Sequence, residues 1–329
     1  FSACNANSKD GETTTVAGQG ESNVTQDAFT ITDGKVTLPY NRTDGINPFF
    51  AESYENIYLA NLLYEPLFSI DKNYNTTNAI AESVSFEGKT VIVKLQHNVL
   101  CSDSSTIIAP DVEYSFNLAK NSYYWGNMLK NVLSATVLDD YTISFNLEFK
   151  DVYVLGKLVF PIVKFGTANG RESVPVGSGE YAFAEDKLVN RIVADETIYL
   201  AEISDHSSSQ DAFNIGMTDV FFSDLSNCDY SVTTGKVDKM TLCNMVYIGI
   251  NESNGALDKY VRNAIAVKLD TDNMALSAYQ GHAIGNKLPV SPDSILFNEI
   301  TKVESTGNKK LADDIIDRCG YTKYSNGAK

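Results

Sequence analysis

Hydrophobic positions divide residues 90–119 into three predicted elements. Residues 90–95 place apolar side chains at every second position, which predicts a strand with one packed face. Residues 96–106 are polar and rich in Asn, Ser and Asp, as is typical of a loop. Pro110 suits the first turn of a helix, whose apolar stripe continues to residue 119. The apolar positions of this strand–loop–helix unit are Val91, Val93, Leu95, Val112, Phe116 and Ala119.

Further strands are predicted where short apolar runs alternate or lie between turn residues. Pro39, in the first of them, favours a sheet edge or a strand end. Two runs on either side of Asp139-Asp140 predict a β-hairpin with one buried face. The last run is continuously apolar and predicts a buried strand. The predicted strands are residues 36–40, 132–138, 141–147, 189–194, 197–203 and 241–251.

Other segments repeat apolar residues at helical spacing. Ser53 is a predicted cap of a helix that ends before Pro66. Asp111 and Glu113 add negative charge to the first turn of the helix at 110, where the helix dipole favours it. A helix through residue 268 and another over 310–319 follow. The predicted buried face of the Ser53 helix consists of Tyr54, Ile57, Tyr58 and Leu62.

Charge and residue usage narrow the possible partners. The 329 residues carry a net charge of −16, so the surface repels nucleic acid and anionic lipid headgroups. No apolar run reaches the roughly 18–20 residues that span a bilayer. The five cysteines are widely spaced, and the three histidines lie far apart without neighbouring ligand types. We therefore expect no metal site and no cofactor.

An ordered series of residues in the strand–loop–helix unit matches a known family pattern. Cys101 departs from the pattern's aromatic residue, and Ser104 departs from its glycine. The matching positions are Lys94, Leu95, Val99, Ser102, Asp103, Ala109, Asp111, Val112, Tyr114 and Ser115. With these residues the chain resembles the family 5 solute-binding proteins of ABC importers, which bind peptides, nickel or other solutes.

Shorter matches extend the resemblance over most of residues 36–329. They are Asn47-Pro48-Phe49, residues 63–68, residues 81–83, the Gly-x-Gly-x-Tyr of 177–181 and the Val-Arg-x-Ala-Ile of 261–265. Glu180 replaces the family's usual proline. The resemblance covers the front portion of a family member.

The resemblance implies an α/β fold with mixed sheets, arranged in two lobes like a type II, Venus-flytrap periplasmic binding protein. The second lobe is expected to be incomplete. The implied segments are a lipoprotein terminus and tether at 1–29, a first lobe, and the first part of a second lobe at 244–329. The first lobe comprises its first part at 30–60, a subdomain at 61–165 and a second part at 166–243.

The first four residues, Phe-Ser-Ala-Cys, resemble the end of a bacterial lipoprotein signal. Cys4 is then the predicted lipidation site, and an ordinary cysteine near a terminus is the alternative. Residues 5–28 contain no aromatic residue and are rich in Gly, Ser, Thr and Asn. This composition suits a flexible tether. These features predict an outer-surface protein that meets the membrane through its lipid anchor alone.

Candidate ligand contacts come from both lobes. Three adjacent aromatic residues at 123–125 cannot all face one core, so at least one is expected to be exposed. Packing in a small satellite core is the alternative for Tyr124 and Trp125, and a plain core strand is the alternative for the apolar residues of 241–251. The predicted ligand-binding residues are Tyr40, Asn41, Tyr124, Trp125, Asn244, Met245 and Tyr247.

These observations favour capture of an extracellular solute for an importer. A peptide is the leading solute, with delivery to ABC permease subunits by a monomer. Nickel or another solute, or a surface lipoprotein without a transport ligand, are the alternatives. The acidic pairs at 139–140 and 313–314 resemble solvated surface, and nucleophile-elbow, zinc-protease and Walker motifs are absent. We therefore expect a binding protein and not an enzyme.

Overall fold

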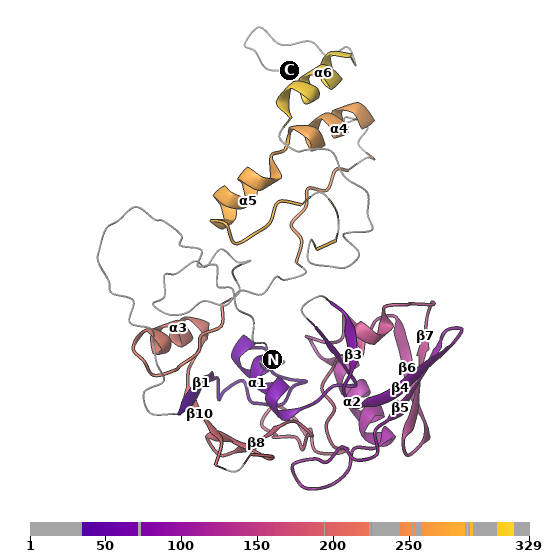
Figure 1. Ribbon diagram of the computed structural model, residues 1–329, viewed down its shortest axis with the longest axis vertical. Coiled ribbons are helices and arrows are strands. Elements are labelled where there is room, and N and C mark those ends of the chain that lie inside the picture. Colours follow the sequence, from indigo (N-terminus) through magenta and orange to yellow (C-terminus); the bar gives the residue numbers. More distant parts are fainter. Residues whose placement is uncertain are drawn as a thin grey trace, which may run out of the picture. The chain divides into compact units, whose positions relative to one another are not determined.

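The computed structural model describes residues 35–71, 74–193, 195–223, 225, 244–251, 253, 258–286, 288, 290–291 and 308–318. The described chain divides into two compact units, and the division follows Phe222 (Figure 1). All described strands belong to the first unit, and the regular elements described in the second unit are helices. The predicted lipidation site Cys4 and the tether lie outside the described residues.

One sheet of the first unit joins the start of the chain to later strands. It consists of β1 (Val36–Tyr40), β8 (Tyr181–Ala184), β9 (Lys187–Asn190) and β10 (Thr197–Glu202), in the order β1-β10-β9-β8. β1 runs parallel to β10, and the other pairs are antiparallel. β9 ends earlier than predicted because the Asn190 side chain accepts the N–H groups of Ile192 and Val193 and forms a turn.

The outer edge of β1 is closed in two ways. Pro39 has no N–H to offer, as its position in the sequence predicts. The Thr37 N–H donates to the Asp219 carboxylate, and the Asp219 N–H donates to the Thr37 carbonyl oxygen. Asp219 thus takes the place that a further strand would need.

The second sheet is antiparallel, with the order β4-β5-β7-β6. Its strands are β4 (Ala81–Glu87), β5 (Thr90–Leu95), β6 (Val132–Asp139) and β7 (Thr142–Leu147). α2 (Ala109–Asn121) contacts β6 and β7. The six apolar positions predicted for the strand–loop–helix unit are all buried, and Phe116 meets Phe145 edge-on at 5.7 Å. The predicted unit and the 132–147 hairpin are confirmed.

Two small elements complete this part of the first unit. β2 (Phe68–Ile70) and β3 (Thr76–Asn78) form an antiparallel hairpin, and η1 (Val154–Lys157) is a short 3-10 helix.

α1 (Tyr54–Leu63) ends before Pro66 as predicted, but it buries a different face. Tyr54 and Tyr58 are 41% and 36% exposed, so the predicted apolar stripe is wrong. The helix instead buries Glu55, Asn56, Leu59, Ala60 and Leu63. Its polar members turn inward because they find partners there, as for the Asn56 amide, which donates to two backbone carbonyls.

Ser53, the residue before α1, does not cap the helix with its side chain. Its hydroxyl donates to the carboxylate of Asp44, so the predicted side-chain cap is wrong.

Gly177 and Gly179 are required by a close backbone approach to the end of α1. A Cβ atom at Gly177 would lie 2.5 Å from the Leu63 carbonyl oxygen. A Cβ atom at Gly179 would overlap the Leu62 carbonyl oxygen. The Gly179 N–H donates to Leu63 O at 2.9 Å. The Gly-x-Gly pattern therefore joins the strand region at 177–181 to α1 within the first unit.

Replacing Gly177 with alanine is expected to lower the free energy of unfolding of the first unit by about 1–3 kcal/mol, the usual range for overpacking. Gly156 is the matched control, because its nearest neighbour to an added Cβ is a side-chain atom of Ile70 at 3.8 Å. Urea unfolding of G177A and G156A, followed by circular dichroism, compares them. Equal midpoints for the two variants would contradict this account.

α3 (His206–Asn214) begins at Asp205, whose side chain accepts the Ser208 N–H at 2.8 Å. The hydrogen bond from the Ser208 backbone holds the pKa of Asp205 below its ordinary value. A Gly-x-x-Asp sequence at 216–219 follows α3 and ends at the Asp219 that closes the edge of β1.

The second unit contains α4 (Lys259–Lys268), α5 (Thr271–Tyr279) and α6 (Lys309–Arg318). α4 and α6 pack against each other, in agreement with the two predicted helices. Residues 244–250 have no regular structure and are almost entirely exposed, so the predicted buried strand is wrong there, while 241–243 lie outside the described residues. An apolar strand needs a paired neighbour, and no described strand pairs with this segment. Within the described chain, no helix is long and apolar enough to cross a membrane.

Candidate functional site

The aromatic segment after α2 is folded into a tight turn. The Ser122 hydroxyl donates to the Ala119 carbonyl oxygen and accepts the Trp125 N–H. The Gly126 N–H donates to Ser122 O at 3.1 Å, and a Cβ atom on Gly126 would lie 2.7 Å from that oxygen. This turn fixes the backbone from which the neighbouring aromatic side chains project.

Tyr124 and Trp125 form an edge-to-face pair, with ring centroids 4.7 Å apart and an interplanar angle of 80°. Tyr124 is 45% exposed, whereas Trp125 packs against the hydrophobic core. The Trp125 indole N–H points to the Pro48 carbonyl oxygen at 3.4 Å. We call Tyr124 and Trp125 the aromatic platform. The Trp125 ring is held by its hydrogen bond to Pro48, and the Tyr124 ring is partly exposed to solvent.

The contact with Pro48 connects the platform to the β1–α1 loop, which also contains the predicted Asn41. The Asn41 amide oxygen accepts from Thr43 Oγ1 and from the Asp44 N–H, and its amide nitrogen donates to Ser204 O at 3.3 Å. Asn41 therefore holds the loop together. The structure joins Trp125 to this loop through Pro48, whereas the Asn41 side chain bonds within the loop and to Ser204.

Tyr40 lies inside the first sheet's core. It is 9% exposed, and its ring meets Phe183 edge-on at 5.7 Å. Burial is the main cause that raises the pKa of its hydroxyl. The geometry gives Tyr40 a packing role directly before Asn41.

The carboxyl ends of the parallel strands β1 and β10 meet at one edge of the sheet, where ligands often bind in α/β proteins. There Glu55 of α1 is buried, and its carboxylate lies 3.0 Å from Nδ1 of His206 at the start of α3. The His206 ring stacks on Phe221 at 5.5 Å and meets Tyr54 edge-on. Local sequence patterns do not reveal this pair, because 151 positions separate Glu55 from His206.

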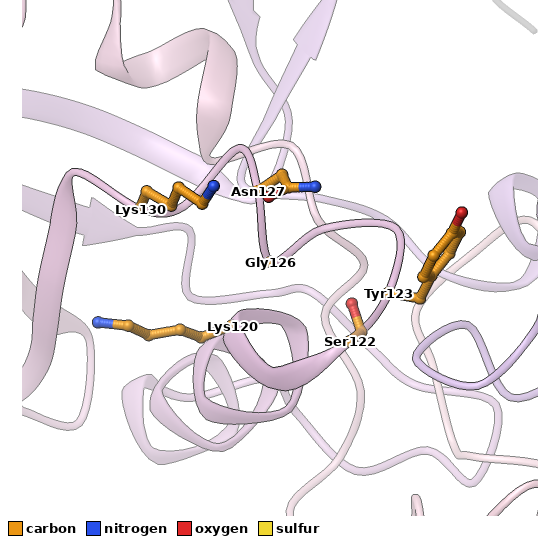
Figure 2. Close-up of a pocket in the computed structure, with 6 residues that line it drawn as sticks. All are labelled: Lys120, Ser122, Tyr123, Gly126, Asn127 and Lys130. Atoms are coloured by element: carbon orange, nitrogen blue, oxygen red, sulfur yellow. The ribbon is translucent and has the colours of Figure 1, made fainter.

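A concave pocket of about 430 Å³ lies beside the aromatic platform, between the end of α2 and the following turn (Figure 2). Its polar side chains include two lysines and no acid. We call it the lysine pocket; its lining residues are Lys120, Ser122, Tyr123, Gly126, Asn127 and Lys130.

The remaining predicted contacts belong to the second unit. Met245 and Tyr247 are 48% and 74% exposed, and Asn244 is also exposed. The role of all three as ligand contacts stays a prediction.

A metal centre finds no support in the residues that the structure describes, since no three His, Cys, Asp or Glu side chains lie close enough to hold an ion. Cys101 is free and buried, and burial raises the pKa of its thiol.

Comparison with known proteins identifies the family. Residues 75–329 match the model of the bacterial extracellular solute-binding proteins, family 5 Middle. The chain belongs to this family. The glutathione-binding protein GsiB of Shigella boydii, which aligns with this family 5 chain, is 28% identical over 168 residues. That alignment covers 47% of this chain and 32% of the relative, so the chain spans about a third of that protein's length.

Solved structures share the fold of this family 5 chain. NikA from Brucella suis, in complex with Fe(III)-EDTA, has a TM-score of 0.58 at 17% sequence identity. The superposition covers 90% of this chain and 66% of the NikA chain. The oligopeptide-binding protein AppA from Bacillus subtilis, in complex with a nonapeptide, has a TM-score of 0.51 at 20% identity, with coverages of 89% and 65%. These similarities confirm the predicted mixed α/β fold of periplasmic binding proteins. The family resemblance is confirmed, and a solute-binding family agrees with the expected absence of enzymatic activity.

Proposed function

We propose that the protein is the extracellular solute-binding component of an ABC importer, and that its solute is an oligopeptide or a dipeptide. The family membership supports the solute-binding role. The observation that carries the peptide proposal is the aromatic platform, which offers the half-exposed Tyr124 ring on an anchored Trp125. Such rings give a large contact area with a polar tip and adapt to varied side chains.

The solute is proposed to bind between two lobes, with Asn244, Met245 and Tyr247 contributing from the second. The glutathione-binding relative and the nonapeptide complex of a protein with the same fold make peptides the first solutes to test. Anchoring through a lipidated Cys4, a monomeric state and delivery to permease subunits complete the proposal.

Replacing Tyr124 with alanine is expected to weaken peptide binding about 10-fold, because the solute loses an aromatic contact worth about 1–1.5 kcal/mol. Isothermal titration with a pool of di- to hexapeptides measures the effect. Tyr153 is the matched control, since it is 63% exposed in the same unit but lies in the turn before η1. Y153A should bind like the unchanged protein; the peptide proposal fails if no pool member binds.

A further inference from the structure

We propose that the lysine pocket recognises a carboxylate group of the solute, an inference that rests on the proposed solute-binding function. The protein carries a net charge of −16, whereas the lining of this pocket has two lysines and no acidic residue. Its volume of about 430 Å³ falls within the usual range for small-ligand sites.

One lysine of the pocket is held in place by the backbone. The Lys120 ammonium donates to the carbonyl oxygens of Val132 and Leu133, at 2.7 and 2.6 Å, and lies 5.5 Å from the centre of the Phe116 ring. An ammonium has three N–H groups, so one remains for a ligand. Because the position is already fixed, little side-chain entropy is lost on binding.

Three other polar side chains of the pocket are uncommitted, whereas the Ser122 hydroxyl is bound within the turn. Across the described part of the chain, Tyr123, Asn127 and Lys130 have no hydrogen-bonding partner. In Figure 2 the Lys130 side chain extends in the direction of Asn127. Tyr123 is 87% exposed at the rim. Lys130 and Asn127 therefore place an ammonium and an amide near each other in the lining of the pocket.

A purely structural role accounts for Lys120 better than for Lys130. A cation near the end of α2 complements the helix dipole, and Lys120 already satisfies two carbonyls there. Lys130 makes no such bond within the described residues. A carboxylate would accept a charge-assisted hydrogen bond from Lys130 and a further hydrogen bond from the Asn127 amide. The Lys120 side chain extends away from these two groups in Figure 2 and contributes positive charge to the pocket.

The carboxylate can come from the carboxyl terminus of a peptide or from an acidic side chain. Three peptides separate these sources: tetra-alanine with a free carboxyl terminus, the same peptide as its amide, and an amide with one alanine replaced by glutamate. Trp125 is the single tryptophan of the chain and adjoins the pocket, so its fluorescence reports binding directly. Affinities are measured for the unchanged protein, K130Q and K94Q. Lys94 is the control because it is an exposed lysine on β5, away from the pocket.

We expect the free acid or the glutamate peptide to bind about 10-fold more tightly than the alanine amide. K130Q should abolish this preference without changing the affinity for the amide, and K94Q should keep it. Equal binding of all three peptides, or an unchanged preference in K130Q, would overturn the inference and leave the solute-binding proposal standing. If none of the peptides binds, the proposed peptide function fails and the inference falls with it.

Discussion

Replacing Asp111 with alanine is expected to lower the free energy of unfolding of the first unit by about 3–5 kcal/mol. The carboxylate is 1% exposed and accepts the Ile108 N–H at 2.9 Å and the Phe165 N–H at 2.8 Å. It also pairs with the Lys164 ammonium at 2.9 Å. Without it, two backbone donors lose their acceptor and the ammonium loses its counter-charge.

Glu113 provides the control for this substitution. It lies in the same turn of α2 and is partly exposed, and its side chain makes no hydrogen bond or ion pair within the described residues. E113A should change the free energy of unfolding by less than about 0.5 kcal/mol. Urea unfolding followed by Trp125 fluorescence isolates the first unit, because the single tryptophan lies there. Similar stabilities for D111A and E113A would show that Asp111 acts through the helix dipole alone.

The behaviour of Asp111 shows which features the sequence reveals. Its place in the first turn of a helix follows from Pro110 and the apolar stripe, so the helix and the favourable charge are predictable. Its ion pair with Lys164 joins residues that are 53 positions apart in the sequence. A local sequence pattern cannot predict such a contact. The alternation over 90–95 was informative because one face of β5 is buried and its neighbours on both sides are in the same sheet.

Local patterns predict burial wrongly where polar residues face the interior, or where an apolar segment has no neighbouring strand to pair with. α1 was assigned the wrong buried face, because Glu55 pairs with His206 and thereby turns its side of the helix toward the interior. Residues 244–250 are apolar enough for a strand, yet no described strand pairs with them. Burial in both cases depends on a partner distant in the sequence.

The candidate site was predictable in part. Three successive aromatic residues required at least one exposed ring, and both Tyr123 and Tyr124 are exposed, at 87% and 45%. The sequence did not indicate that Trp125 is anchored on Pro48, or that Lys130 joins a pocket with Lys120. These relations arise from the turn after α2, whose geometry depends on Ser122 and Gly126.

Replacing Asp44 with alanine is the second substitution with a large expected effect, about 3–4 kcal/mol in the free energy of unfolding. Its carboxylate accepts the N–H groups of Glu52 and Ser53 and the Ser53 hydroxyl, and it pairs with the Arg171 guanidinium. Asp44 is 9% exposed, so little water is available to replace these bonds. The carboxylate closes the β1–α1 loop onto the start of α1.

The same substitution should also disturb the aromatic platform, because Pro48 lies in the loop that Asp44 closes. A looser loop weakens the hydrogen bond from the Trp125 indole to Pro48 O, so native D44A is expected to show red-shifted tryptophan emission. E52A is the matched control: Glu52 pairs with the same Arg171, but its side chain is 62% exposed, and such pairs contribute about 0–1 kcal/mol. If D44A keeps both the stability and the emission of E52A, then Asp44 does not hold the loop that supports Trp125.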